Sequence, residues 1–236
     1  MSEIHRVRLL VSREHDCGYL PQRTARSAFV DPALRLNPAY YGKLLEQGFR
    51  RSGNYVYRPL CRGCAACLPV RIAVADFRAD RSQRRCLRHN TDLKMTGVDR
   101  LGDEHYALYS TYLRARHPNG GMDPNDAGAF HRFLDAPWSQ TLFLEFRQEQ
   151  HLLALAVVDQ VPHGLSAVYT FFDPTQPQRG LGSYAILRQI EVARDAGLDY
   201  VYLGYWVAES RKMDYKRRFR PLQVMGVGGW QVQTEP

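Results

Sequence analysis

The pattern of apolar and polar positions changes near residue 75. Before it, glycine and proline recur every few residues and interrupt each apolar run, which predicts short extended segments joined by turns. Two further elements are expected in this part. One is a short helix over 40–48 that ends at Gly48, and the other is a strand over 70–77 in which apolar and polar residues alternate.

Helical and strand patterns follow one another in the rest of the chain. Arg81, Arg84, Arg85 and Arg88 recur at the spacing of one helical face, which predicts a basic helix over 81–94. The other expected elements are, in chain order, a helix over 103–116, strands over 141–146, 151–159 and 165–172, a helix over 183–196, a strand over 200–206, a basic helix over 211–219 and a last strand near 223–232. This order predicts an α+β fold, a layer sandwich of the acyltransferase type.

A glycine turn, Gly180-Leu181-Gly182, opens the helix expected from residue 183. The unpaired N–H groups and positive dipole end of a helix N-terminus can hold a phosphate, so Gly180 and Gly182 are candidate ligand contacts. Coenzyme-A-dependent acetyltransferases carry a Gln or Arg three positions before the first glycine, whereas this chain has Pro177, which has no N–H donor. A tight joint between loop and helix explains the two glycines equally well.

The composition narrows the class of protein. With 236 residues, of which 44% are apolar and 11% aromatic, the chain can form a core and is neither disordered nor collagen-like. No apolar run of about 18 residues occurs, and the first residues lack the apolar stretch of a secretory signal. A soluble cytoplasmic protein is therefore expected.

The positive charge is unevenly distributed. Residues 1–100 carry 19 basic and 9 acidic side chains, whereas residues 101–236 carry 13 basic and 15 acidic side chains. Six of the 13 basic residues in the second part fall within 211–220. Of the 32 basic residues 28 are arginines, whose planar guanidinium suits phosphate and base recognition. An arginine-rich genome would explain the choice of Arg over Lys but not the uneven distribution. We therefore expect a polyanionic partner, a nucleic acid.

Three of the five cysteines form a compact string, Cys61-x-x-Cys64-x-x-Cys67. In a protein without an export signal they are expected to be reduced thiols rather than disulfides. With Cys17 they could complete a four-coordinate zinc site or an iron–sulfur cluster. A zinc ribbon, however, has a second pair of cysteines separated by two residues, and this chain lacks that pair. Structural or redox-responsive thiols are the favoured interpretation, and no metal site is firmly predicted.

Several short strings occur in one order along nearly the whole chain. They are Cys17-Gly18-Tyr19-Leu20-Pro21, Phe29-Val30-Asp31-Pro32, Gly48-Phe49-Arg50-Arg51-Ser52-Gly53, Tyr57-Arg58-Pro59 before Cys61, Gln83-Arg84-Arg85, Phe171-Phe172-Asp173-Pro174, Gly180-Leu181-Gly182-Ser183-Tyr184, Tyr202-Leu203-Gly204-Tyr205-Trp206, and Lys212-Met213 followed by Tyr215-Lys216. In this combination the chain resembles the arginyl-tRNA–protein transferase family, specifically its short bacterial branch, the aspartate/glutamate leucyltransferases.

The resemblance implies transfer of leucine from leucyl-tRNA to the N-terminal α-amine of proteins that begin with Asp or Glu, which creates an N-degron for proteolysis. It implies a cysteine-containing N-terminal domain, over 1–80 here, and an acetyltransferase-like aminoacyltransferase domain over 81–236. The implied partners are leucyl-tRNA and the acceptor protein, with no membrane and no DNA. The eukaryotic arginyl branch has a Cys-Gly-Tyr-Cys string linked to cluster binding, and Leu20 replaces its last cysteine here.

Attack of an amine on an aminoacyl ester requires neither a covalent enzyme intermediate nor a cofactor, because the ester is already activated. An α-amine with a pKa of ~7.7–8.0 is partly neutral at physiological pH. The enzyme must hold two large substrates, accept a proton and stabilise an oxyanion. The candidate catalytic residues, chosen by type and position, are Asp173, Tyr205, Lys212 and Lys216, with His117 and His131 as alternative proton acceptors.

The candidate binding residues form two groups. Those for the terminal adenosine and the acceptor carboxylate are Arg51, Arg58, Arg71, Arg179, Tyr202, Trp206 and Tyr215. Tyr202 and Trp206 are expected on one face of the strand over 200–206, because side chains alternate along a strand. Those for the tRNA are Arg81, Arg84, Arg85, Arg88, Gly180, Gly182, Arg217 and Arg218.

Two other functions remain as alternatives. The glycine turn favours a coenzyme-A-dependent N-acetyltransferase, and Pro177 disfavours it. The basic N-terminal part favours a nucleic-acid-binding or metal-binding module without enzymatic activity. The large, nearly neutral second half, with its aromatic strand and glycine turn, disfavours that module.

Overall fold

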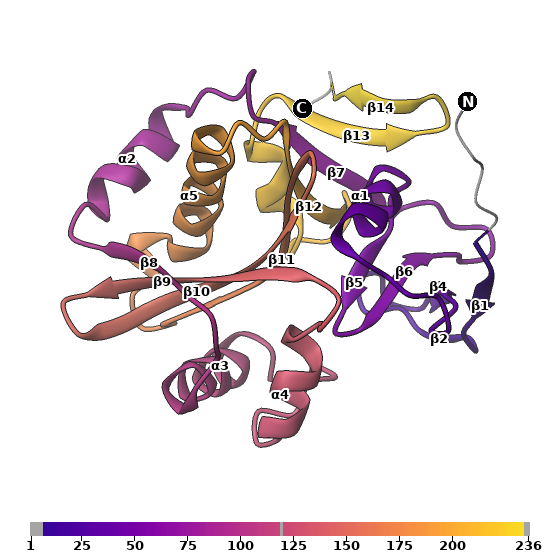
Figure 1. Cartoon of the computed structure of the whole chain (residues 1–236), viewed down its shortest axis with the longest axis horizontal. Coiled ribbons are helices and arrows are strands. Elements are labelled where there is room, and N and C mark those ends of the chain that lie inside the picture. The colour runs from indigo at the N-terminus through magenta and orange to yellow at the C-terminus, as the bar shows by residue number, and fades with distance from the viewer. Residues whose placement is uncertain (1–6, 119, 234–236) are drawn as a thin grey trace.

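An eight-stranded mixed sheet forms the centre of the molecule (Figure 1). The computed structural model describes residues 7–118 and 120–233. The spatial order of the strands is β14-β13-β7-β12-β11-β10-β9-β8. Their bounds are β7 Leu68–Ala73, β8 Lys94–Val98, β9 Gln140–Gln148, β10 His151–Val161, β11 Gly164–Phe172, β12 Tyr200–Trp206, β13 Leu222–Gly226 and β14 Gly229–Val232. Strands β11 and β12 pair in parallel, whereas the other neighbouring strands of this sheet pair antiparallel.

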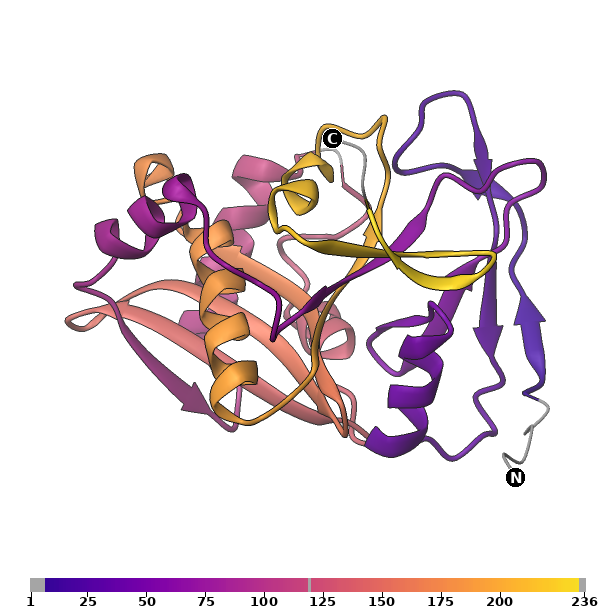
Figure 2. The same ribbon diagram turned by 90° about the horizontal axis from the view of Figure 1, so that it is seen from above.

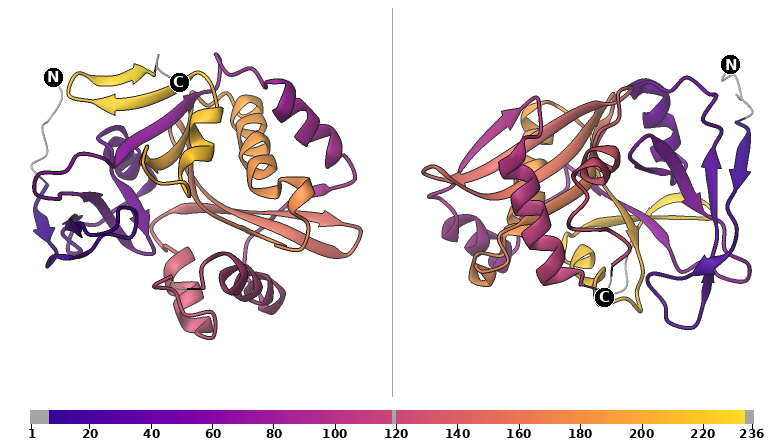
Figure 3. Two further views of the ribbon diagram at one scale, coloured as in Figure 1. Left: turned by 180° about the vertical axis from the view of Figure 1, so that it is seen from behind. Right: turned by 90° about the horizontal axis from the view of Figure 1, so that it is seen from below.

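Helices cover both faces of this sheet (Figures 1 and 3). On one face lie α5 (Leu181–Asp195) and α2 (Arg81–His89), and on the other α3 (Asp103–Arg116) and α4 (Ala127–Leu134). Strand β10 shows why both faces need a cover, since Ala154, Ala156 and Val158 pack toward α5 while Leu155 and Val157 pack toward α3 and α4. No helix among the described residues is long and apolar enough to cross a membrane.

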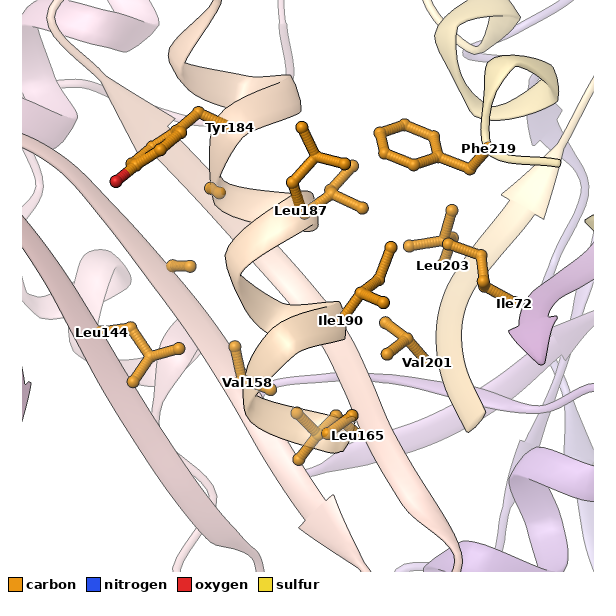
Figure 4. Close-up of a cluster of buried hydrophobic side chains, with 14 of the residues drawn as sticks. Ile72, Leu144, Val158, Leu165, Tyr184, Leu187, Ile190, Val201, Leu203 and Phe219 are labelled. Atoms are coloured by element: carbon orange, nitrogen blue, oxygen red, sulfur yellow. The ribbon is translucent and has the colours of Figure 1, made fainter. Parts of the chain in front are cut away.

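The core under α5 holds the sheet and the helix together. Leu187 and Ile190 of α5 are at most 2% exposed and pack among side chains of β7, β10, β11, β12 and β13 (Figure 4). Phe219, which follows the basic segment, belongs to the same cluster and stacks on Phe77 with ring centroids 6.3 Å apart. The end of the basic segment is therefore anchored in the main core rather than at the surface.

The first part of the chain forms a smaller antiparallel sheet beside one end of the large one (Figure 2). Its strand order is β1 (Leu9–Val11), β4 (Ser27–Val30), β6 (Tyr55–Pro59) and β5 (Arg50–Ser52), with a separate ribbon of β2 (His15–Asp16) and β3 (Thr24–Ala25). Helix α1 (Pro38–Glu46) begins at the cap Asn37, whose side chain accepts from the Tyr40 N–H, and Gly48 follows it with φ +79°. A left-handed φ of this kind favours glycine, as the sequence suggested.

Strand β7 ties the N-terminal segment to the large sheet. It lies before residue 80, yet it pairs with β12 on one side and β13 on the other. The division into domains at residue 80 stays a prediction.

A buried ion pair joins the two sheets. The Arg51 guanidinium on β5 binds the Asp159 carboxylate on β10 through Nη2–Oδ1 (2.7 Å) and Nε–Oδ2 (2.5 Å), and neither side chain is exposed. The Thr141 hydroxyl on β9 donates to the same carboxylate at 2.8 Å. Gly53 adds a backbone link, because its N–H donates to the Phe133 carbonyl at 2.8 Å. The small sheet is thus held against the large one by a fully paired charge.

Several expected elements are confirmed, and others differ for identifiable reasons. The helix over 103–116 and the strand over 200–206 occur with those bounds. The basic helix ends at His89 rather than 94, because the buried Asn90 side chain turns to donate to the Cys86 and Arg179 carbonyls and β8 begins at Lys94. The predicted basic helix over 211–219 is a short 3-10 helix, η2 (Asp214–Arg218), and the last strand is the hairpin β13–β14.

Breaking the ion pair on one side should be costly. We expect Arg51→Met to lower the free energy of unfolding by about 3–5 kcal/mol, since it leaves the Asp159 carboxylate buried without its partner. The double variant Arg51→Met/Asp159→Leu should recover most of that loss, because an apolar replacement of a buried pair is often neutral. Urea unfolding of the three proteins measures both steps, and an equal loss in the single and double variants would contradict this account.

Candidate active site

Two strands of the large sheet separate and leave a pocket between them. Strands β11 and β12 pair only over Gly164–Ser166 and Tyr200–Tyr202. Beyond these residues β12 has an irregularity in its pairing with β7 between Tyr202 and Gly204, and Gly204 has φ +75°. The pocket is lined from β11 and β12 and also from the small sheet; among its lining residues are Gly48, Arg50, Val168, Gly204 and Tyr205.

Arg50 on β5 enters the gap between the separated strands. Its Nη2 donates to the Val168 carbonyl on β11 at 3.1 Å. On the other side, a Cβ added to Gly204 of β12 would lie 2.8 Å from Arg50 Nη1. A side chain at position 204 would therefore displace the guanidinium, which gives this glycine a steric reason besides its positive φ.

Lys216 reaches the same region from η2. Its side chain is buried at 3% exposure, and its Nζ donates to the Tyr205 carbonyl at 2.5 Å. Burial, together with the positive charge of Arg50, lowers the pKa of Lys216 to about 7. The ring of Tyr215 lies with its centroid 5.8 Å from Nζ. A substantial fraction of Lys216 is therefore a neutral amine at neutral pH and can accept a proton.

The hydroxyl of Tyr205 is engaged in holding the walls of the pocket together. It donates to the Gly48 carbonyl at 2.8 Å and lies 3.2 Å from the Tyr57 carbonyl. Burial raises the pKa of this phenol well above its ordinary value. The contact between Tyr205 and Lys216 accordingly runs through the backbone carbonyl of Tyr205.

Neither Arg50, which lines the pocket, nor Lys216 beside it has an acidic partner among the described residues. Among residues 7–118 and 120–233, no carboxylate forms an ion pair with Arg50 or Lys216, and the charged group that acts on Lys216 is Arg50. Positive charge that is removed from water and not neutralised attracts an anion strongly. The pocket is therefore suited to a substrate that brings a negative charge next to an amine.

Three of the four arginines predicted for the acceptor carboxylate are engaged elsewhere. Arg51 and Arg179 already bind carboxylates of the protein, Asp159 and Asp92. Arg71 is buried, with its guanidinium carbon 3.5 Å from the Tyr200 ring centroid and its Nε bonded to the Gln223 amide oxygen at 2.7 Å. These contacts occupy the three guanidinium groups within the protein, and the predicted substrate contacts of Arg51, Arg71 and Arg179 stay predictions. Arg58 is exposed and stacks over Phe49 at 5.0 Å.

The expectation that Tyr202 and Trp206 share one face is wrong. Tyr202 packs with Tyr41 and Trp230 on the side of α1, whereas Trp206 packs in the core under α5. The irregularity at Gly204 shifts the alternation of side chains by one position, so residues on its two sides no longer share a face.

Three further predicted residues lie outside the pocket lining. Asp173 forms a turn, because its Oδ1 accepts from the Thr175 N–H and hydroxyl at 2.9 and 2.7 Å. Lys212 is exposed, and Tyr215 is 39% exposed. Their predicted roles stay predictions. Arg50, by contrast, lines the pocket but is not among the residues that the sequence predicted. It is adjacent to Arg51 in the sequence, and the two arginines differ in the direction in which their side chains point.

The two basic segments of the sequence lie next to each other. The Gln83 side chain of α2 donates to the Arg218 carbonyl of η2 at 2.9 Å. We call the exposed arginines of these two elements the basic surface: Arg81, Arg84, Arg85, Arg88, Arg217 and Arg218. Arg217 also pairs with Asp214 at 2.6 Å. Since η2 also carries Lys216, which bonds to the carbonyl of the pocket residue Tyr205, one short segment connects the basic surface to the pocket.

The glycine turn lies near α2. Gly180 has φ +61° and precedes α5, and the Cys86 thiol of α2 lies 3.7 Å from its carbonyl. A Cβ at Gly182 would lie 3.2 Å from the Phe172 ring, so this glycine allows close packing of helix on strand. The predicted contacts of Gly180 and Gly182 with tRNA stay predictions.

Four cysteines gather at the small sheet. Burial, followed by the nearby thiols of Cys17, Cys61 and Cys64, raises the pKa of Cys67 to about 11. All five cysteines are free thiols. Among the described residues, no group of three or more His, Cys, Asp or Glu side chains is placed to hold a metal ion. Zinc or iron–sulfur binding by the four cysteines stays a prediction, and no catalytic step is derived through it.

Comparison with known proteins agrees with the resemblance seen in the sequence. Residues 15–85 match the family described as "Arginine-tRNA-protein transferase, N terminus", and residues 104–226 match "Arginine-tRNA-protein transferase, C terminus". The chain therefore belongs to the arginine-tRNA-protein transferase family.

Relatives in this family extend over nearly the whole chain. A protein of Stenotrophomonas maltophilia named "Aspartate/glutamate leucyltransferase" is 51% identical to this chain, in an alignment that covers 95% of this chain and 92% of the relative. A protein of the same name from Alcanivorax borkumensis is 46% identical, in an alignment that covers 100% of this chain and 98% of the relative. A solved structure, the C-terminal domain of a putative lysylphosphatidylglycerol synthetase from Agrobacterium fabrum, aligns with a TM-score of 0.47 and 12% identity over 74% of this chain and 56% of its own.

The lowered pKa of Lys216 predicts a pH-dependent stability. Between about pH 7 and its ordinary pKa of 10.5, the unfolded chain binds more protons at this lysine than the folded chain, so stability rises with pH by up to ~1.4 kcal/mol per unit. In Lys216→Met that contribution is absent. Urea unfolding of both proteins at pH 7, 8 and 9 should show that the free energy of unfolding of the wild type rises with pH relative to that of Lys216→Met. The same pH dependence in both proteins would refute the lowered pKa.

Proposed function

We propose that this protein transfers leucine from leucyl-tRNA to the α-amine of proteins whose first residue is Asp or Glu, which marks them for proteolysis. The observation that carries the proposal is the agreement of nearly the whole chain with relatives named aspartate/glutamate leucyltransferase. The region around the pocket supports it as well, because Arg50 lines the pocket without a carboxylate partner among the described residues, and Lys216, an amine that can accept a proton, bonds to the carbonyl of the lining residue Tyr205. A reaction that consumes charged tRNA would take place in the cytoplasm.

Lys216 is the proposed proton acceptor of this reaction. The neutral acceptor α-amine attacks the ester carbonyl carbon, a carbon–nitrogen bond forms, and Lys216 takes the proton that the nitrogen loses. When the carbon–oxygen ester bond breaks, the same proton passes to the ribose oxygen of the tRNA. A lysine with a pKa of about 7 suits both transfers, since it binds and releases a proton near neutral pH.

The fold supports an acyltransferase-like arrangement for the same step. Parallel strands β11 and β12, connected by α5, separate beyond their first three residue pairs, as we expect where an acyl donor approaches the strand ends. The basic surface lies next to this region through the contact between α2 and η2. We propose that it holds the tRNA phosphates while the aminoacyl end enters the pocket.

A donor and acceptor screen tests the proposed reaction. Total tRNA charged with single labelled amino acids is offered with peptides that begin with Asp, Glu or Ala, and acetyl-coenzyme A replaces the tRNA in a parallel reaction. We expect transfer only from leucyl-tRNA and only to Asp and Glu peptides. Arginine transfer would reassign the donor, and acetyl transfer would establish the competing acetyltransferase function.

The basic surface can be tested through the salt dependence of binding. We expect Arg84→Ala/Arg85→Ala to weaken leucyl-tRNA binding and to reduce the slope of log K against log salt by about one for each phosphate that the variant no longer binds. Fluorescence anisotropy with labelled tRNA at several salt concentrations measures both. The matched control Arg100→Ala/Arg132→Ala removes the same charge from exposed positions outside the basic surface, and an equal effect in both variants would exclude a localised tRNA site.

A further inference from the structure

Arg50 is half-buried and differs in its partners from two other arginines of the chain. Its neighbour Arg51 is neutralised by Asp159, and Arg179 by Asp92. The Arg50 guanidinium makes one hydrogen bond, to the Val168 carbonyl, out of the five N–H donors that it carries. Its charge has no carboxylate within the described residues, although the pocket around it is largely withdrawn from water.

The surroundings of Arg50 favour a small anion rather than a bulky one. The groups that interact electrostatically with Arg50 are the tyrosine hydroxyls of Tyr57, Tyr19, Tyr205 and Tyr41, and no carboxylate is among them. The backbones of β11 and β12 limit the gap from both sides, at Val168 and Gly204. A planar carboxylate matches the fork of a guanidinium in such a slot and can accept two parallel hydrogen bonds from it.

The position of Lys216 adds a second requirement. Lys216 donates to the carbonyl of Tyr205, and Tyr205 lines the same pocket as Arg50, so the amine lies next to the pocket that holds the guanidinium. A molecule bound there should bring an amine to Lys216 and a carboxylate to Arg50, a few bonds apart. The first residue of a chain that begins with Asp or Glu has this combination, whereas one that begins with Asn, Gln or Ala lacks the carboxylate.

We propose that Arg50 is the residue that selects the acceptor, by binding the side-chain carboxylate of its N-terminal Asp or Glu between β11 and β12. This inference rests on the proposed leucine transfer and assigns its specificity to one guanidinium. An acceptor with a neutral side chain is rejected because it leaves the Arg50 charge unpaired in the pocket. The separation of β11 from β12 and the glycine at 204 then have one purpose, which is to admit this side chain.

The test compares matched peptides in the full-length wild type and in Arg50→Gln. Leucine transfer from leucyl-tRNA is measured to peptides that differ only in a first Asp or Asn. We expect kcat/KM for the Asp peptide to fall about 30-fold or more in Arg50→Gln, while the low value for the Asn peptide changes little. The preference for Asp over Asn should therefore shrink by a similar factor. Arg50→Lys, which keeps the charge without the fork, should retain part of it.

Two controls separate the possible failures. Arg100→Gln, an exposed arginine outside the pocket lining, should keep wild-type rates and preference, and circular dichroism reports whether each variant is folded. If both peptides lose rate equally in folded Arg50→Gln, or if leucyl-tRNA binding weakens instead, Arg50 does not select the acceptor and the inference is overturned. If the wild type transfers no leucine to either peptide, the proposed function itself fails.

Discussion

The buried pair of Arg51 and Asp159 is the contact on which the arrangement of the pocket depends. It joins β5 of the small sheet to β10 of the large one, and both charges are completely withdrawn from water. Because successive side chains of a strand point in opposite directions, fixing Arg51 against β10 directs the preceding residue, Arg50, away from Asp159 and into the gap between β11 and β12. Arg51 is thus neutralised by a carboxylate, whereas the adjacent Arg50 has no carboxylate partner among the described residues.

The same region connects both substrates of the proposed reaction. Lys216 lies on η2, whose following residue Phe219 is held in the core under α5, and the Arg218 carbonyl accepts a hydrogen bond from α2. Arginines of α2 and η2 therefore cannot move far from the buried amine. In the proposed reaction, one short segment of chain therefore carries both the arginines assigned to the tRNA and the lysine assigned to proton transfer.

Sequence reasoning predicted the periodic elements and the family but could not place individual side chains. The helix over 103–116 and the strand over 200–206 are long and regular, so their patterns are unambiguous. The irregularity before Gly204 reverses which residues share a face, and no local signal marks it, since a glycine in a strand has several meanings. The choice between Arg50 and Arg51 depends on a carboxylate more than a hundred residues away, which spacing cannot reveal.

The central claim is that Lys216 titrates near pH 7, so that a substantial fraction of it is a neutral amine there, and this can be measured directly. The chain has four lysines, at 43, 94, 212 and 216, so protein labelled with carbon-13 in lysine gives four side-chain signals to follow by NMR as the pH is raised. We predict that one signal titrates near pH 7 and that this signal disappears in Lys216→Met. A Lys216 signal that does not titrate near pH 7 would contradict the account.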